Sequence, residues 1–460
     1  MRRFLVWMAA GVLVGASAPA GLAAQGYGIF EHGTCMMGRA GTGVATPCAD
    51  GSAIFFNPAG IVGTSGARGT LGVGMTYIGP KGSFTNDVTL EKTSLEDQKF
   101  YIPHLYYARD LGGGYAAGIG VFAPYGLETD WGPSFEGRFL GYNSKVQSIY
   151  VQPTFGAQIT QDIRFGGGID FSFVKVNLRQ RADLYSTTLA PGVTGANLGF
   201  ARGTDFADIN LDGDATGIGF NLGVTWQAHP RVALGARYLS QQEIFVNKAT
   251  ADITQIPTGL VLAPGNPLGL PAGTPVDAVV APQFSGTGAL VDQSGSTKLT
   301  FPSQLIFGVA VKATSQLNLL ADVQWVEWKK FETLALQFER LPQKIIREDY
   351  QNTVGWRFGA EYAYNSRYTA RLGFLSHGAA APDQTVTPNL PEGPRTEFTG
   401  GVGAELTPKL HVDVAYQYID QADRRGRTTD GGLAVPTTAV NNGLYTFNAH
   451  LFGATFTYKL

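Results

Sequence analysis

Apolar residues recur at every second position along most of this chain. Over residues 216–226 one face of an extended segment is apolar and the other is small or polar. The apolar face consists of Ile218, Phe220, Leu222, Val224 and Trp226. The same alternation recurs over residues 354–362 and 410–418. A period of two indicates β-strands with one apolar face, so the chain is predicted to be all-β.

The alternation predicts fourteen strands. They lie near residues 67–79, 98–110, 114–123, 144–158, 165–180, 213–228, 231–247, 298–313, 316–338, 351–364, 366–376, 394–407, 410–420 and 445–460. Their connections are alternately short and long, which is typical of an outer-membrane barrel with short periplasmic turns and long external loops. A soluble β-sandwich has no reason to keep its long loops at one end. We therefore expect a 14-stranded antiparallel transmembrane β-barrel over residues 65–460.

Composition narrows the class of protein further. Only 15% of the 460 residues are charged and the net charge is -2, whereas an ordinary soluble domain has about 25% charged residues. This balance does not fit a nucleic-acid-binding surface, so no nucleic-acid partner is expected. No apolar run approaches the roughly 20 residues that a membrane helix needs, which excludes a helical membrane protein.

The C-terminal strand is suited to closing a barrel. Lipid offers no hydrogen bonds to an open sheet edge, so a sheet that spans a membrane must pair its first and last strands. Residues 452–460 alternate between apolar and small or polar side chains up to the end of the sequence. We expect a monomer that contacts outer-membrane lipid and is inserted by the barrel-assembly machinery.

The first residues predict export. Arg2 and Arg3 precede an apolar stretch and then small residues, the layout of a signal peptide over residues 1–24 with cleavage near Ala24. The two cysteines of the chain, Cys35 and Cys48, then meet an oxidising periplasm and are predicted to form a disulfide.

Residues 25–64 are rich in glycine and do not alternate. The Gly-x-Gly piece at residues 41–43 invites comparison with a phosphate-binding loop, but no strand precedes it and no Lys-Ser/Thr pair follows. A fourteen-stranded barrel has a lumen too wide for its own side chains to fill, so water or a folded segment occupies it. We expect residues 25–64 to form an N-terminal hatch that plugs the lumen.

Several motifs resemble one family of membrane proteins. The stretch Ile54-Phe55-Phe56-Asn57-Pro58-Ala59-Gly60 is similar to the Asn-Pro-Ala hatch motif of the FadL (OMPP1/FadL/TodX) family of outer-membrane long-chain fatty acid transporters. Further similarities follow in the family's order at residues 120–127, 137–139, 302–304, 322–328 and 391–396. The resemblance implies a fourteen-stranded barrel with an N-terminal hatch and diffusion-driven uptake of hydrophobic molecules.

The resemblance also implies a route for the cargo. In that family a kink in the third strand opens the wall beside the hatch, and the substrate leaves sideways into the membrane. Gly and Pro weaken strand pairing, so we expect the kink at Gly118, Gly120 or Pro124. Asn57 and Pro58 are expected to hold the hatch toward that opening. The residues of the expected path are Ile54, Phe55, Phe56, Asn57, Pro58, Ala59, Gly118, Gly120, Phe122 and Pro124.

The cargo is expected to be a hydrophobic small molecule, with long-chain fatty acids first and aromatic or aliphatic hydrocarbons as the alternative. Three cations in or beside predicted loops are candidate partners for a carboxylate: Arg138, Arg202 and Lys344. Charged residues on strands are expected to face the lumen, because charge facing lipid is costly. These residues are Arg237, Asp322, Arg357, Glu361 and Asp413.

Catalysis has little support in the sequence. The six histidines are scattered, and the motifs of zinc proteases and of α/β-hydrolases are lacking. No enzyme activity, metal or cofactor is therefore expected, and His411 and Asp413 are interpreted as polar lumen residues. A hydrolase assembled from separate strands, a general diffusion porin and an adhesive barrel with functional loops are the alternatives. A barrel whose first strand began almost at the start of the mature chain would favour the porin.

Overall fold

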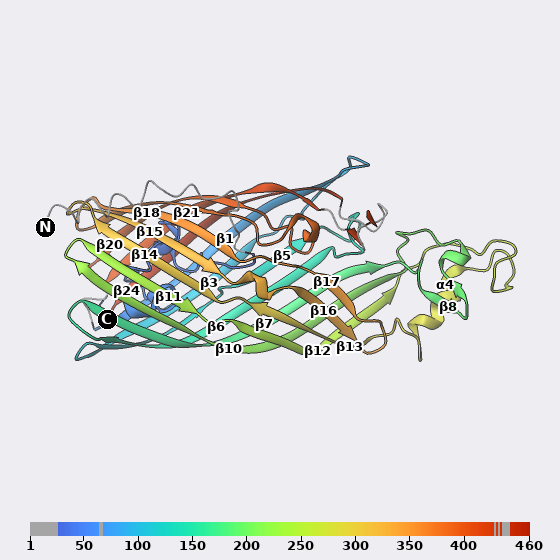
Figure 1. The fold of residues 1–460 in the computed structure, drawn as a ribbon, viewed down its shortest axis with the longest axis horizontal. Coiled ribbons are helices and arrows are strands. Elements are labelled where there is room, and N and C mark those ends of the chain that lie inside the picture. The colour runs from blue at the N-terminus through green and yellow to red at the C-terminus, as the bar shows by residue number, and fades with distance from the viewer. Residues whose placement is uncertain (1–25, 64–67, 427–428, 431–432, 435–441) are drawn as a thin grey trace.

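The structure, a computed structural model, describes residues 26–63, 68–426, 429–430, 433–434 and 442–460. Fourteen wall strands, four of them in two pieces, form one antiparallel sheet (Figure 1). The sheet closes on itself because β1 (Gly69–Asn86) pairs with both β3 (Phe100–Gly112) and β24 (Gly443–Lys459). The predicted barrel is confirmed. The predicted signal peptide, residues 1–24, lies outside the described residues.

The wall strands follow one another around the barrel in chain order. Between β3 and β24 they are β4 (Tyr115–Phe122) with β5 (Gly126–Asp130), β6 (Asn143–Gln158), β7 (Ile163–Ala182), β10 (Ala207–His229), β11 (Val232–Leu239) with β12 (Gln242–Gln255), β13 (Gln293–Phe301) with β14 (Gln304–Lys312), β15 (Leu317–Val326) with β16 (Thr333–Phe338), β18 (Thr353–Ala363), β19 (Tyr368–His377), β20 (Arg395–Thr407) and β21 (Leu410–Gly426). Short strands in the loops are β2 (Lys92–Ser94), β8 (Thr188–Ala190), β9 (Val193–Thr194), β17 (Lys344–Arg347), β22 (Thr429–Asp430) and β23 (Leu433–Ala434).

Several wall strands, among them β1, β10 and β21, are longer than predicted, and four others consist of two pieces. The strands expected over 231–247, 298–313 and 316–338 are each interrupted, and the loop expected over 124–143 contains β5. One interruption falls at Pro302, which has no N–H to donate to the β-ladder. Local pattern alone does not reveal such breaks, because the alternation of side chains continues on both sides of them.

The two faces of the wall follow the predicted alternation. On β10 the side chains of Ile218 and Phe220 are 66% and 43% exposed, whereas Asn221 between β7 and β11 is fully buried. On β18, Trp356 and Phe358 face outward and Arg357 is buried in the interior. The apolar face of the barrel is therefore its lipid-facing surface, and polar groups line the lumen.

The helices are short, and most of them lie inside the barrel or in the long loops. They are α2 (Thr34–Met37), α3 (Ala53–Phe56), α4 (Val276–Val280) and the 3-10 turns η1 (Pro58–Ile61), η2 (Ala196–Leu198), η3 (Ala281–Phe284), η4 (Trp328–Lys330) and η5 (Asp383–Thr385). Within the described ranges, no helix has the length and apolar character needed to cross a membrane. The main apolar core lies in the lumen, and a second one joins the long loops around β8 and α4 (Figure 1).

Candidate functional site

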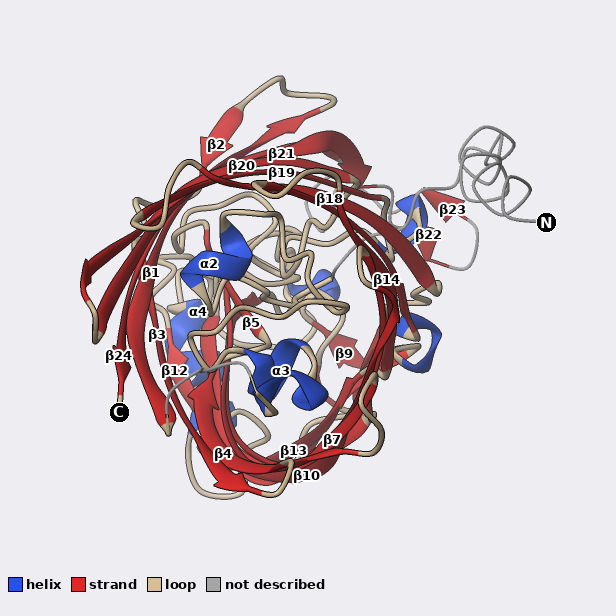
Figure 2. Cartoon of the chain, turned by 90° about the vertical axis from the view of Figure 1, so that its left-hand side faces the viewer, coloured by secondary structure: helices blue, strands red, loops and turns tan. Residues whose placement is uncertain are grey.

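The N-terminal segment, residues 26–63, lies inside the ring of strands, as α2 and α3 show in Figure 2. Polar groups of the wall hold it there. The Asp322 carboxylate on β15 accepts hydrogen bonds from the backbone N–H groups of Gly43 at 2.9 Å and Val44 at 3.2 Å. Asn221 on β10 donates to the carbonyl of Phe55 at 2.9 Å. The lumen is therefore occupied by protein at this level.

Two buried arginines of the wall lie against phenylalanine rings of the N-terminal segment. The guanidinium carbon of Arg237 is 4.0 Å from the ring centroid of Phe55, and that of Arg357 is 4.2 Å from the ring centroid of Phe30. Both arginines are 1% exposed. Cation–π contacts of desolvated cations contribute about 2 kcal/mol or more each, so these charges fix the segment to the wall.

Asn57 connects three parts of the chain. Its side-chain amide donates to the carbonyls of Val44 and of Val224 on β10, the latter at 3.0 Å. Its side-chain oxygen accepts from the N–H of Ala59 at 3.1 Å and caps η1. A Cβ atom on Gly223 would lie 1.9 Å from that oxygen, so glycine is required for this approach. The wall contact of Asn57 lies on β10, and its expected role in holding the hatch toward the opening stays a prediction.

Gly118 and Gly120 make room for the N-terminal segment. Both lie in the regularly paired strand β4. A Cβ atom on either glycine would lie 3.0 Å from side-chain atoms of Ile54, so a larger residue would crowd that side chain. Strand β4 ends at Phe122 and β5 begins at Gly126, so residues 123–125 interrupt this wall strand. Of the three positions named from the sequence, the break therefore lies at Pro124.

An aromatic cluster divides the lumen into two compartments. The ring of His32 lies 4.3 Å from that of Phe55, 5.3 Å from that of Phe56 and 5.1 Å from that of Phe122. Burial, more than the neighbouring His104 and Arg237, lowers the pKa of His32 well below its ordinary value. The imidazole is therefore neutral at neutral pH and packs as part of an apolar barrier.

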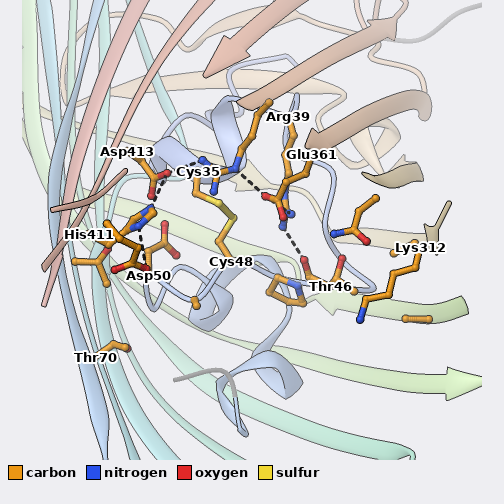
Figure 3. Close-up of a pocket in the computed structure, with 18 of the residues that line it drawn as sticks. Cys35, Arg39, Thr46, Cys48, Asp50, Thr70, Lys312, Glu361, His411 and Asp413 are labelled. Carbon is orange, nitrogen blue, oxygen red and sulfur yellow. Dashed lines mark hydrogen bonds and ion pairs between the residues drawn. A yellow bond between two sulfur atoms is a disulfide. The ribbon is translucent and has the colours of Figure 1, made fainter. Parts of the chain in front are cut away.

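The compartment at the short-turn end is a polar vestibule of about 580 Å³ (Figure 3). Arg39 of the N-terminal segment lies 3.5 Å from the Glu361 carboxylate, which also binds Arg371 at 2.8 Å. Arg371 and His411 both contact Asp413, at 2.6 and 3.2 Å. These charges belong to the lumen, as predicted, and an apolar molecule gains nothing from them.

The predicted cysteine pair borders this vestibule. Cys35, at the start of α2, and Cys48 are joined by a disulfide, with 6.3 Å between their Cα atoms (Figure 3). The bridge closes the loop that carries Arg39, Gly43 and Val44. The loop that contacts the wall is thus covalently restrained.

On the opposite side of the aromatic cluster, the third wall strand, which consists of β4 and β5, turns away from its neighbour β3. The pairing of β3 with β1 begins at Phe100, whereas its pairing with β4 begins only at Leu105. Beyond β4, the carbonyl of Pro124 accepts a hydrogen bond from the N–H of Ile29 at 2.8 Å, and Gly126 donates to Tyr27 at 2.9 Å. The N-terminal segment thus supplies the partner for a wall strand that has left β3.

A cavity of about 400 Å³ lies at this break. Its lining combines the free edge of β3 at residues 100–103, the break at residues 121–127 and residues 26–29 of the N-terminal segment. Most of the lining side chains are apolar, among them Leu127, Phe447 and Leu451. The cavity extends to Ile149, which is 52% exposed on the lipid-facing side of β6. The arrangement suits an apolar molecule and connects the lumen with the outer face of the wall.

Of the residues predicted for the path, Phe122 lines the cavity, and Pro124 lies at the break between its lining residues Ala123 and Tyr125. Ile54, Phe55, Phe56, Asn57, Pro58 and Ala59 are fully buried beneath it in the N-terminal segment. Tyr27 and Ile29 were missed because their role depends on pairing with residues about a hundred positions away. The signal available was the Pro-Tyr-Gly sequence at 124–126, because Pro and Gly both weaken strand pairing.

None of the three predicted carboxylate partners lines the cavity. Arg138 binds Asp205 at 2.8 Å, Arg202 lies 4.3 Å from the ring centroid of Tyr185, and Lys344 donates to Gln180. Burial lowers the pKa of Lys344 to about 8. The cation that does line the cavity is Arg395, whose Nε donates to Gln421 at 3.1 Å.

Metal-binding side chains do not gather anywhere in the part of the chain that the structure describes. No group of three or more His, Cys, Asp or Glu residues there is placed to hold a metal ion.

Comparisons with known proteins agree with this architecture. A family model described as outer membrane protein transport protein (OMPP1/FadL/TodX) matches residues 13–460. Outer membrane protein P1 of Haemophilus influenzae is 21% identical over 433 residues, 87% of each chain. The long-chain fatty acid transport protein of Escherichia coli O6:H1 is 22% identical over 444 residues, 94% of each chain.

Solved structures show the same fold. A FadL homologue of Pseudomonas aeruginosa has a TM-score of 0.77 at 19% identity, with 95% of this chain and 100% of that chain covered. The toluene transporter TodX of Pseudomonas putida has a TM-score of 0.68 at 17% identity, with 96% and 100% covered. Since the family model spans nearly the whole chain, the protein belongs to the OMPP1/FadL/TodX family of outer-membrane transporters of hydrophobic compounds and resides in the bacterial outer membrane.

Proposed function

We propose that this protein takes up hydrophobic molecules by passive diffusion, capturing them in the apolar cavity and releasing them sideways through the interrupted wall beside β4. The observation that carries this proposal is the position of the cavity. Its lining includes the N-terminal segment on the lumen side and the free edge of β3 at residues 100–103 on the wall side. A molecule in the cavity thus borders both the lumen and the bilayer.

The energetics of capture need no external source. Each methylene group that leaves water for an apolar site contributes about 0.8 kcal/mol. Release into the bilayer keeps that gain, because the hydrocarbon core is as apolar as the cavity. Entry into the periplasmic vestibule would forfeit it, since Arg39, Glu361 and Asp413 line that compartment. Lateral release is therefore the favoured exit.

In this proposal the N-terminal segment acts as a hatch. Its contacts with Asp322, Arg237 and Arg357 fix it across the lumen. A general diffusion porin, the alternative function, has an open aqueous lumen, and the filled lumen argues against it. Closure of the wall within one chain by β1 and β24 supports a monomer, and insertion by the barrel-assembly machinery is part of the proposal.

Two classes of cargo fit the body of the cavity. The relative from Escherichia coli is named for long-chain fatty acids and the structure from Pseudomonas putida for toluene. Long-chain fatty acids were the first expectation from the sequence and hydrocarbons the alternative. Both bring an apolar body that the lining accepts, but only the fatty acid carries a carboxyl head group. No catalytic step belongs to this proposal.

The proposal is tested by uptake into cells. Cells that produce the protein and cells that lack it are given labelled fatty acids, labelled small aromatic molecules and a polar solute of similar size. We expect faster uptake of a hydrophobic class and unchanged uptake of the polar solute. Equal acceleration of all solutes would contradict the proposal and favour a porin.

A further inference from the structure

The lining of the apolar cavity also includes polar side chains. Three glutamates line it, on the N-terminal segment, on β5 and on β20: Glu31, Glu128 and Glu397. The charge of Glu128 is balanced by Lys145 at 2.9 Å. Glu31 and Glu397 have no such ion pair with lysine or arginine in the part of the chain that the structure describes. The polar end of a molecule bound in the cavity would therefore meet these two carboxylates.

One amide joins the two carboxylates. The Nε2 of Gln417 donates to Glu31 at 2.9 Å and to Glu397 at 2.6 Å. The remaining oxygens accept from the backbone N–H of Phe30 at 2.8 Å and contact the Nε2 of His377 at 3.1 Å. Each carboxylate oxygen has two lone pairs, so each can still accept a hydrogen bond from a ligand in the cavity.

Two arginines lie near these carboxylates. Arg357 is in electrostatic contact with both glutamates, but it lies against Phe30 and does not line the cavity. Arg395 lines the cavity two residues from Glu397 on the same strand face, its Nε donates to Gln421, and its guanidinium carbon is 5.5 Å from the ring centroid of Phe447. Burial and the charge of Glu397 raise the pKa of Glu31, as expected when two carboxylates repel each other.

We propose that the cavity prefers hydrophobic molecules whose polar end donates hydrogen bonds, such as alkylamines and alcohols, over carboxylate anions of the same chain length. This inference rests on the proposed function and names the head group that the site selects. A donor fills the free lone pairs of Glu31 and Glu397, and a cation also relieves their repulsion. An anion adds negative charge beside two carboxylates that already repel each other. A fatty acid fits in its protonated form, since a carboxylic acid group donates.

A matched series of ligands tests the proposal. Dodecylamine, dodecanol and dodecanoate share one alkyl chain, and their affinities at pH 7.4 are measured by displacement of a fluorescent probe from the protein in lipid nanodiscs. Empty nanodiscs report partition into lipid. A hydrogen bond to a charged group changes affinity by about tenfold or more, so dodecylamine should bind at least about tenfold more tightly than dodecanoate, with dodecanol between them.

Variants assign the preference to the glutamates. Glu31→Gln with Glu397→Gln keeps the size of both side chains and should reduce the ratio of the two affinities to within about threefold. Glu31→Gln alone leaves the wall unchanged and should reduce it partially. Glu339→Gln, an exposed glutamate outside the cavity, is the control and should keep the full ratio.

The outcomes separate this inference from the proposed function. Tighter binding of dodecanoate than of dodecylamine would overturn the head-group preference and leave hydrophobic uptake intact. A full preference retained in the double variant would overturn the role of Glu31 and Glu397. Binding of none of the three above the empty nanodiscs would contradict capture in the cavity, and with it the proposed function.

Discussion

The backbone N–H of Ile29 donates a hydrogen bond to the carbonyl of Pro124 across 2.8 Å. This contact joins the N-terminal segment to the one place where the third wall strand leaves its neighbour. The backbone groups exposed by the break are thereby partly satisfied inside the lumen, as an interruption at membrane depth requires. The same contact places the segment beside the apolar cavity. A movement of the segment would therefore change the shape of the cavity.

Filling the break should block uptake. Ala123 lines the cavity at the interruption, and Ala123→Trp places a large ring there. Overpacking costs about 1–3 kcal/mol, which corresponds to roughly 5-fold to 150-fold in affinity for the cargo. Uptake of a labelled hydrophobic substrate should fall by that factor at equal surface expression. Ala370→Trp, on the exposed face of β19, is the matched control. Equal uptake by both variants would contradict a route through the break.

Asn57 should anchor the hatch without supporting the barrel. Asn57→Ala removes the bonds to Val44 and Val224 and the cap of η1. The loss should lower the free energy of local opening of residues 26–63 by about 1–2 kcal/mol. Hydrogen exchange of that segment should accelerate and uptake should fall. Asn365→Ala removes the two side-chain bonds of the short periplasmic turn between β18 and β19 and should leave both unchanged. Identical exchange in the two variants would refute the anchoring role.

The disulfide should be complete in the exported protein. A bridge between residues 13 positions apart stabilises a loop by about 3 kcal/mol in the chain-entropy view. Thiol labelling of protein purified without reductant should be negligible until the protein is denatured and reduced. The barrel should persist after reduction, since the wall pairing does not involve Cys35 or Cys48. Labelling of both sulfurs before reduction would show that the bridge is not formed.

Alkaline pH should loosen the external loops. Burial, followed by the charge of Asp349, raises the pKa of Glu348 to about 8. The neutral carboxyl is thus favoured in the folded loop, so the stabilisation is complete below the ordinary pKa of about 4.5 and is lost as the pH rises through 8. The carbonyl of Glu348 accepts from Thr385 at 2.6 Å, which ties two loops together. Proteolysis near residues 339–350 should increase between pH 6 and 9, and Glu348→Gln should remove most of that dependence. A pH-independent rate in the unmodified protein would contradict this assignment.

Much of the wall could be predicted from the sequence, because lipid and lumen impose a period of two on every strand. The outward faces of β10 and β18 and the buried Arg237 and Arg357 follow from that rule. Neither the interruption at residues 123–125 nor the approach of Ile54 to Gly118 follows from it, since both depend on contacts between distant segments. Arg395 was seen only as part of a family motif, because nothing local shows that a residue at a strand end lines a cavity.

The central claim is a path that admits hydrophobic molecules and excludes salt, and one measurement tests it directly. Proteoliposomes that contain the intact protein, a salt-sensitive dye and an internal trap for a hydrophobic probe report both fluxes in the same vesicles. With the lumen filled by residues 26–63, the probe should accumulate faster than in protein-free vesicles while the salt signal stays at the background rate. Rapid salt entry with no preference for the hydrophobic probe would contradict the transporter and indicate an open porin.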